Sequence, residues 1–214
     1  MARVAGISVV MASDAEGSGA GGGSGVGGGA GAFAQPFKNY GRMDETSKLV
    51  CRAVAHAVRD AGLGYPFAPD VQAAIVGTSA EGCLEMDTLY FRDYVECGRK
   101  LGRGNYFVYT LPSSPMGEAT IHFAMEGPSL FVSGGLASAM STAMALIEDG
   151  EAALAFAVVS TRDRAACVAI SATEGAINTS GITARLVGAA TIDDEIEIVS
   201  RTIEERGAPG RCKR

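Results

Sequence analysis

Short apolar runs alternate with amphipathic segments along most of this chain. A continuous apolar run of about four to eight residues is typical of a β-strand that is buried on both faces. Such runs occur at residues 4–10, 71–76, 129–132, 153–159 and 167–171. The segment at residues 183–190 predicts one further strand.

Amphipathic segments lie between the predicted strands. Residues 44–62 carry an apolar stripe at helical spacing, with Asp44 as a candidate N-cap and Gly62 as the terminating residue. Further helices are predicted at residues 84–97, at residues 118–125 and from residue 137 onward. Strands that alternate with helices across short loops predict an α/β domain, in which helices cover both faces of a layered, mixed and mostly parallel sheet.

Two segments fall outside this pattern. Residues 17–31 consist almost wholly of Gly, Ala and Ser, and such a composition predicts a flexible loop. A phosphate site there is disfavoured, because no Lys-Ser/Thr pair closes a P-loop and no amphipathic helix begins directly after it. Residues 193–214 are highly charged, so we expect a C-terminal tail behind a domain that spans residues 1–192.

The composition excludes several classes of function. The 214 residues carry a formal net charge of −6, which opposes nucleic-acid binding. Five irregularly spaced cysteines form no C-x-x-C pair, so we expect no metal site, no disulfide framework and no cofactor. Reduced thiols predict a cytoplasmic location. No apolar run approaches the roughly 20 residues of a membrane span, and the apolar start fits a strand better than a signal peptide.

Residues 127–150 have the pattern of a nucleophile elbow. A short apolar strand is followed by a tight turn of small residues and then by a helix rich in Ala and Met. The residues around the bend are Ser133, Gly134, Gly135, Leu136, Ala137 and Ser138. An elbow normally places Ser or Cys at the bend. Here the residue best placed at the bend is Leu136, whose side chain offers no reactive group. The pattern therefore indicates the scaffold of an enzyme more clearly than an activity.

Five segments carry motifs in a specific order. They are MDETS (43–47) leading to DAGL (60–63), AIVGT (74–78) with EGCLE (81–85), LPSSPMGEA (111–119), FAMEGPS (123–129), and residues 137–145 with IEDGEA (147–152). Each motif is weak alone, but together they resemble the N-terminal half of a β-ketoacyl synthase of the thiolase-like superfamily. The resemblance spans most of residues 1–160 and implies a thiolase-like half-fold.

The resemblance also implies a loss of catalysis. The residue at the position of Leu136 is the acyl-accepting cysteine of the family, and leucine cannot form a thioester. The two histidines that assist the family's reaction lie in the second half of its chain, which is mostly absent here. A long connection of the family is shortened around residues 162–166.

Two other side chains are weak candidates for a reactive group. Cys83 follows a glycine loop before a helix, whose N-terminus can lower the pKa of a thiol, although a buried inert thiol is favoured. His122 lies beside Ile121 and Phe123, and a structural or surface role is favoured. Ser133 and Ser138 would need a base within reach, and the chain has only two histidines.

Three functions stay open. The chain is expected to be a non-catalytic, chain-length-factor-like partner in fatty acid or polyketide-type metabolism. It would form a homodimer, or a heterodimer with a full-length ketosynthase, with an acyl carrier protein as a further candidate partner. The resemblance implies pairing through the elbow strand and its neighbours. Alternatively, it is an acyltransferase or condensing enzyme with a relocated nucleophile. The third hypothesis is a self-associating structural protein, in which Met140, Met144 and Ile147 form an apolar face that a second copy covers.

Overall fold

The computed structural model describes residues 2–15, 33–100, 102–172 and 177–207. The Gly-rich segment 17–31 and the last residues, 208–214, lie outside them. Six described strands form one sheet in the order β3-β2-β4-β5-β1-β6. Their bounds are β1 (Arg3–Met11), β2 (Ala73–Ser79), β3 (Ser129–Phe131), β4 (Leu154–Ser160), β5 (Arg164–Ser171) and β6 (Ile177–Asn178).

The sheet is mixed, as the sequence predicts, but antiparallel pairs outnumber parallel ones among the described strands. β2 pairs in parallel with β3 and with β4, whereas the β4–β5, β5–β1 and β1–β6 pairs are antiparallel. The expectation of a mostly parallel sheet is therefore wrong. For the β4–β5 pair the reason is local. β4 and β5 are joined by a tight turn, closed by the Thr161 amide on the Arg164 carbonyl at 2.9 Å, and only antiparallel strands can be joined in this way.

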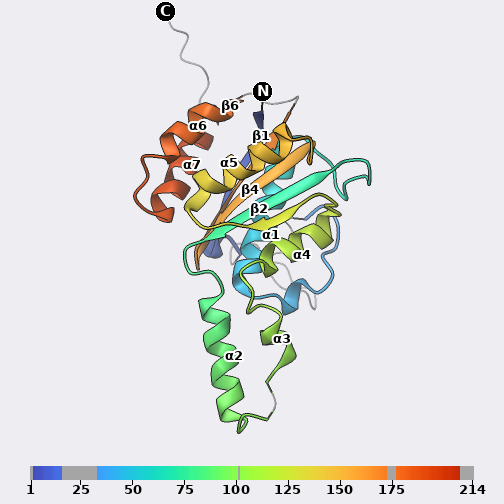
Figure 1. Cartoon of the computed structure of the whole chain (residues 1–214), viewed down its shortest axis with the longest axis vertical. Coiled ribbons are helices and arrows are strands. Elements are labelled where there is room, and N and C mark those ends of the chain that lie inside the picture. The colour runs from blue at the N-terminus through green and yellow to red at the C-terminus, as the bar shows by residue number, and fades with distance from the viewer. Residues whose placement is uncertain (1, 16–32, 101, 173–176, 208–214) are drawn as a thin grey trace, which may run out of the picture.

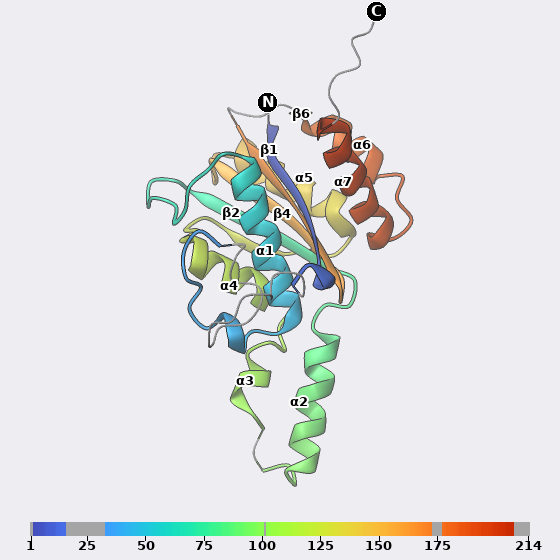
Figure 2. The same cartoon turned by 180° about the vertical axis from the view of Figure 1, so that it is seen from behind.

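Helices cover both faces of the sheet, which confirms that part of the prediction (Figure 1 and Figure 2). On one face lie α1 (Glu45–Asp60) and α4 (Ser114–Phe123). On the other lie α5 (Gly135–Glu148), α6 (Thr179–Leu186) and α7 (Ile192–Gly207). The buried apolar residues accordingly form two clusters, here called the α1-side core and the α5-side core. Two short 3-10 helices, η1 (Ala12–Ala15) and η3 (Tyr40–Arg42), complete the N-terminal region.

Two expectations about the C-terminal region are wrong. Residues 183–190 do not form a strand, because α6 covers Thr179–Leu186 and buries Ile182 and Leu186, which lie one helical turn apart. Residues 193–207 do not form a tail, because they belong to α7. This helix buries Ile196 and Val199, at helical spacing, in the α5-side core. Abundant charges on the other faces of α7 hide this apolar stripe in the sequence.

An arm formed by α2 (Leu84–Glu96) and α3 (Gly104–Phe107) extends away from the sheet and its helices (Figure 1). None of the described residues of α2 or α3 is buried. Contacts between the two helices hold the arm together: the Arg103 amide donates to Asp93 at 3.1 Å, and the rings of Tyr90 and Phe107 lie 5.5 Å apart. The arm therefore exposes side chains that the fold itself does not use.

The first strand and the first helix approach each other closely. Gly6 permits this, because a Cβ atom at that position would lie 2.2 Å from the Ala57 carbonyl oxygen and 2.8 Å from the Ala61 nitrogen. Two hydrogen bonds accompany the approach. The Ser8 hydroxyl donates to the Ala53 carbonyl at 2.6 Å, and the Ile7 amide donates to an Asp60 carboxylate oxygen at 3.0 Å. The backbone of α1 thus rests directly on β1.

We predict that Gly6→Ala lowers the free energy of unfolding by about 2 kcal/mol, because the new methyl group meets backbone atoms that cannot move without displacing α1. Urea unfolding followed by circular dichroism measures this change. Gly64→Ala is the matched control, since no atom lies within 4 Å of the added carbon, and it should change stability by less than about 0.5 kcal/mol. Equal stability of the two variants would contradict the close packing of α1 on β1.

Candidate functional site

The predicted elbow lies between β3 and α5. The Val132 amide still donates to the Gly77 carbonyl at 2.9 Å, and α5 begins only three residues later at Gly135. Gly134 and Gly135 have φ values of 109° and 78°, in the left-handed region that residues with a side chain rarely adopt. The sharp turn therefore depends on this glycine pair.

Leu136 lies immediately after the turn, and its side chain is completely buried. It belongs to the α5-side core, together with Met140 of its own helix and Ile196 of α7. The structure therefore fills the bend of the elbow with apolar volume. Leu136 brings no group that could react with a thioester.

The serines beside the elbow have no histidine that could activate them. Ser133 is exposed, and Ser138 is half-buried in the first turn of α5. His56 lies on α1 and His122 on α4, and both helices cover the opposite face of the sheet from α5. The sheet itself separates these serines from both imidazoles, so neither can act as a base for Ser138.

The elbow also binds a carboxylate that the sequence analysis missed. The Leu136 amide donates to Glu195 of α7 at 2.7 Å, and the Ala137 amide donates to the other oxygen of the same carboxylate at 3.3 Å. A signal was present in the sequence. Ile192, Glu195, Ile196 and Val199 recur at helical spacing, which places Glu195 on the same face as three apolar residues.

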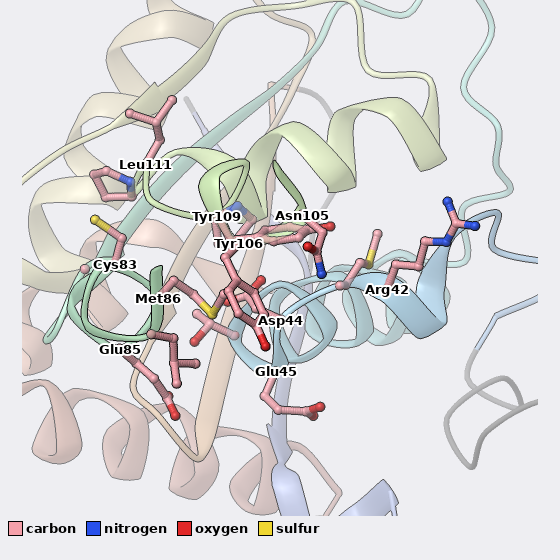
Figure 3. Close-up of a pocket in the computed structure, with 16 residues that line it drawn as sticks. Arg42, Asp44, Glu45, Cys83, Glu85, Met86, Asn105, Tyr106, Tyr109 and Leu111 are labelled. Atoms are coloured by element: carbon pink, nitrogen blue, oxygen red, sulfur yellow. The ribbon is translucent and has the colours of Figure 1, made fainter. Parts of the chain in front are cut away.

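A cavity of about 230 Å³ lies elsewhere, between the start of α1, the arm and the segment that leads into α4 (Figure 3). Its lining includes Asp44, Cys83, Glu85, Met86, Tyr106 and Tyr109. A second cavity, of about 400 Å³, adjoins it and is also lined by Glu85 and Leu89. No elbow residue lines either cavity. The structure thus separates the predicted elbow from the two concave surfaces.

Two titratable side chains of the smaller cavity, Cys83 and Tyr109, have raised pKa values. Burial raises the pKa of the Cys83 thiol, and so does the nearby Asp87 carboxylate, which accepts a bond from Sγ at 3.3 Å. Burial and Glu118 raise the pKa of Tyr109, whose hydroxyl donates to Glu118 at 2.8 Å. The pKa of Cys83 is therefore raised, not lowered, at the start of α2. The cavity contains no activated thiolate.

His122 lies outside both cavities, among aromatic rings. Its imidazole stacks on Phe37, with ring centroids 3.7 Å apart and an angle of 4° between the planes. Phe33, Tyr65 and Phe123 surround the same ring at 4.9–5.3 Å. Burial lowers the pKa of His122, and its Nε2 atom is buried without a hydrogen-bond partner in the described structure. These contacts indicate a packing role.

The apolar face expected on α5 is not open. Met140 is fully buried, Ile147 is 9% exposed and Met144 is half-buried, because the sheet, α6 and α7 cover this side of the helix. The expectation of an uncovered helix layer is therefore wrong for the isolated chain. The expectation fails because it places a strand and a tail at residues 183–207. These residues belong largely to α6 and α7, which cover this side of α5.

The described ranges contain no group of three or more His, Cys, Asp or Glu side chains that could hold a metal ion. No helix within the described parts of the chain is long and apolar enough to cross a membrane.

Solved structures of ketosynthases have a similar fold. "The ishigamide ketosynthase/chain length factor" matches with a TM-score of 0.59 and 15% identity, over 82% of this chain and 63% of that chain. A ketosynthase in complex with its chain length factor from Xenorhabdus doucetiae gives 0.51 and 18%, over 65% and 62%. A type II PKS acyl-carrier protein in complex with its ketosynthase bound to the hexaketide gives 0.56 and 11%, over 80% and 58%.

At such low identities the structural likeness concerns the fold alone, and the chain spans only about three fifths of the length of these structures. The predicted thiolase-like α/β half-fold is confirmed. No curated protein sequence matches the chain significantly. Residues 29–184, well over half of the chain, match the family described as "Beta-ketoacyl synthase, N-terminal domain". The chain therefore belongs to the β-ketoacyl synthase family.

Proposed function

We propose that the chain is a non-catalytic, ketosynthase-like subunit that pairs with an acyl-condensing β-ketoacyl synthase. The observation that carries this proposal is the completely buried Leu136 at the bend between β3 and α5. The sequence resemblance aligns Leu136 with the family's acyl-accepting cysteine. A buried leucine fills the place of the acyl group with apolar volume and leaves the bend without a nucleophile.

The solved structures of similar fold support a role in pairing. Two of them are described as a ketosynthase with a chain length factor, and a third as a ketosynthase in complex with an acyl-carrier protein. By analogy, we propose a ketosynthase as the partner of this chain, and an acyl carrier protein as a further ligand of the pair. The free thiols of Cys51, Cys83, Cys97 and Cys167 agree with a location in the cytoplasm.

Two features offer a surface for such a partner. β3 is the terminal strand of the sheet, and no described strand pairs with its outer side. The arm exposes the apolar side chains of Leu84, Phe91 and Phe107, each at 60% or more. Exposed aromatic and aliphatic side chains of this size, gathered on one projection, are typical of a protein–protein interface.

The same surface supports a second candidate, in which a second copy of the chain replaces the ketosynthase. The exposed side chains of the arm would then be covered by the arm of the other copy. A condensing enzyme with a relocated nucleophile has less support, because Cys83 has a raised pKa and His122 is enclosed by aromatic rings.

The pairing is tested by co-expressing the chain with a β-ketoacyl synthase from the same organism. We expect an equimolar complex in size-exclusion chromatography with light scattering. Leu84→Asp combined with Phe91→Asp should weaken the association at least about tenfold, because charges enter an apolar contact. Val187→Asp is the control, since Val187 is 74% exposed and directly follows α6, a helix that lies far from the arm (Figure 1).

Three outcomes separate the candidates. A complex that the arm variant disrupts supports the proposed function. A stable dimer of this chain that excludes the synthase would instead support self-association. A monomer that binds no synthase would contradict both.

The absence of an activated thiol is tested at Cys83. We expect iodoacetamide to modify Cys83 more slowly than the exposed Cys97 at neutral pH, because burial and Asp87 raise the pKa of Cys83. Asp87→Asn should accelerate the modification several-fold, whereas Glu85→Gln, which changes a carboxylate of the same cavity that is not bonded to the thiol, should not. Acyl transfer from a labelled thioester to Cys83 in the unmodified protein would favour the condensing enzyme instead.

A further inference from the structure

Helix α5 begins without a cap from its own segment. Its N-cap residue is Gly134, which has no side chain, so the first amides of the helix have no local acceptor. Backbone amides at a helix N-terminus attract negative charge, because the helix dipole adds to their own partial charges. At an elbow, such amides bind the carboxylate or the carbonyl oxygen of a ligand.

In this chain the carboxylate of Glu195, 59 residues after Leu136, accepts the first amides of α5. Glu195 is only 6% exposed, and its two oxygens accept the Leu136 and Ala137 amides at 2.7 and 3.3 Å. Gly135 leaves the room for it, because a Cβ atom at Gly135 would lie 2.6 Å from either carboxylate oxygen. Glu195 forms no ion pair with any described residue, so these amides are its charge partners.

Contacts along its whole length fix α7 in this position. Near its start, Asp193 pairs with the guanidinium group of Arg164 on β5. In its middle, Ile196 and Val199 pack in the α5-side core beside Leu136. At its end, Arg206 pairs with Asp60 of α1 at 2.7 Å. The carboxylate of Glu195 is thus delivered to the elbow by a helix that is attached on both sides of it.

We propose that α7 is an intramolecular plug, in which Glu195 occupies the anion position of the elbow and closes it to acyl and carboxylate ligands. The plug is a feature of the isolated chain, and it does not depend on the partner proposed above. An acyl group at the bend would need the two amides that Glu195 holds and the space that α7 fills. Restoring a cysteine at the bend would therefore not restore an accessible nucleophile.

The test follows the reactivity of a cysteine introduced by Leu136→Cys. Iodoacetamide modification is followed site by site, by peptide mapping in a mass spectrometer. We expect the introduced thiol to react as slowly as the buried Cys167, because α7 covers it and Glu195 opposes formation of a thiolate. Adding Glu195→Ala should raise its rate at least about tenfold, since the helix N-terminus then faces the thiol without a competing anion.

Two further variants control the experiment. Glu195→Gln keeps the shape of the plug but removes its charge, and it should give an intermediate rate. Glu197→Ala changes an exposed carboxylate of the same helix, paired with Arg201, and should leave the rate of the Leu136→Cys protein unchanged. The rates at Cys51 and Cys167 report on the whole fold and should stay low throughout.

The outcomes are distinct. Fast modification of the introduced thiol with Glu195 in place, or no response to either Glu195 variant, would overturn the plug. An equal rise at Cys51 and Cys167 would overturn it too, because opening would then be global unfolding. Binding of a synthase by the unmodified chain is measured separately, so failure of the plug and failure of the proposed function are distinguishable.

Discussion

The structure depends on one constraint, which is that its sheet is apolar on both faces. Every residue of β4 is buried, and six consecutive residues of β2 and of β5 are buried as well. A sheet of this kind is stable only when two helix layers remove it from water. α1 and α4 provide one layer, and α5, α6 and α7 provide the other. Residues 179–207 are therefore part of the core, although they lie largely outside the segment that matches the family.

The sequence predicts those elements in which the apolar residues follow one clear pattern. Prediction fails where charged residues hide the spacing of the apolar ones. The five apolar strand runs and the helix capped by Asp44 are confirmed, because continuous burial and one clear apolar stripe leave little ambiguity. α7 was missed, since Ile196 and Val199 are surrounded by acidic and basic residues. The antiparallel pairs were missed for another reason: strand direction depends on the connection between strands, and the turn at residues 161–163 is too short to be recognised by composition.

At the candidate site, the sequence predicts the turn but not its occupant. Two adjacent glycines, Gly134 and Gly135, predict a sharp bend because glycine adopts backbone conformations that other residues avoid. The leucine that follows them has no nucleophilic group. Glu195 could not be placed there, because its position follows from the packing of a helix far along the chain. The cavity beside the arm could not be predicted from the sequence either, because its lining comes from three segments that only the fold brings together. The proposed loss of the nucleophile and the proposed closure of the elbow are two separate changes, and the second is visible only in three dimensions.

The carboxylate of Asp60 binds both the Ile7 amide of β1, 53 positions earlier in the chain, and Arg206 near the end of α7, 146 positions later. Contacts of such long sequence separation form late in folding, because the chain must pay the entropy of a large loop first. During synthesis the N-terminal elements leave the ribosome before α7 exists. The Leu136 and Ala137 amides therefore have no Glu195 carboxylate to bind until the ribosome has made α7. Until then, water or another acceptor must satisfy these two amides at the start of α5.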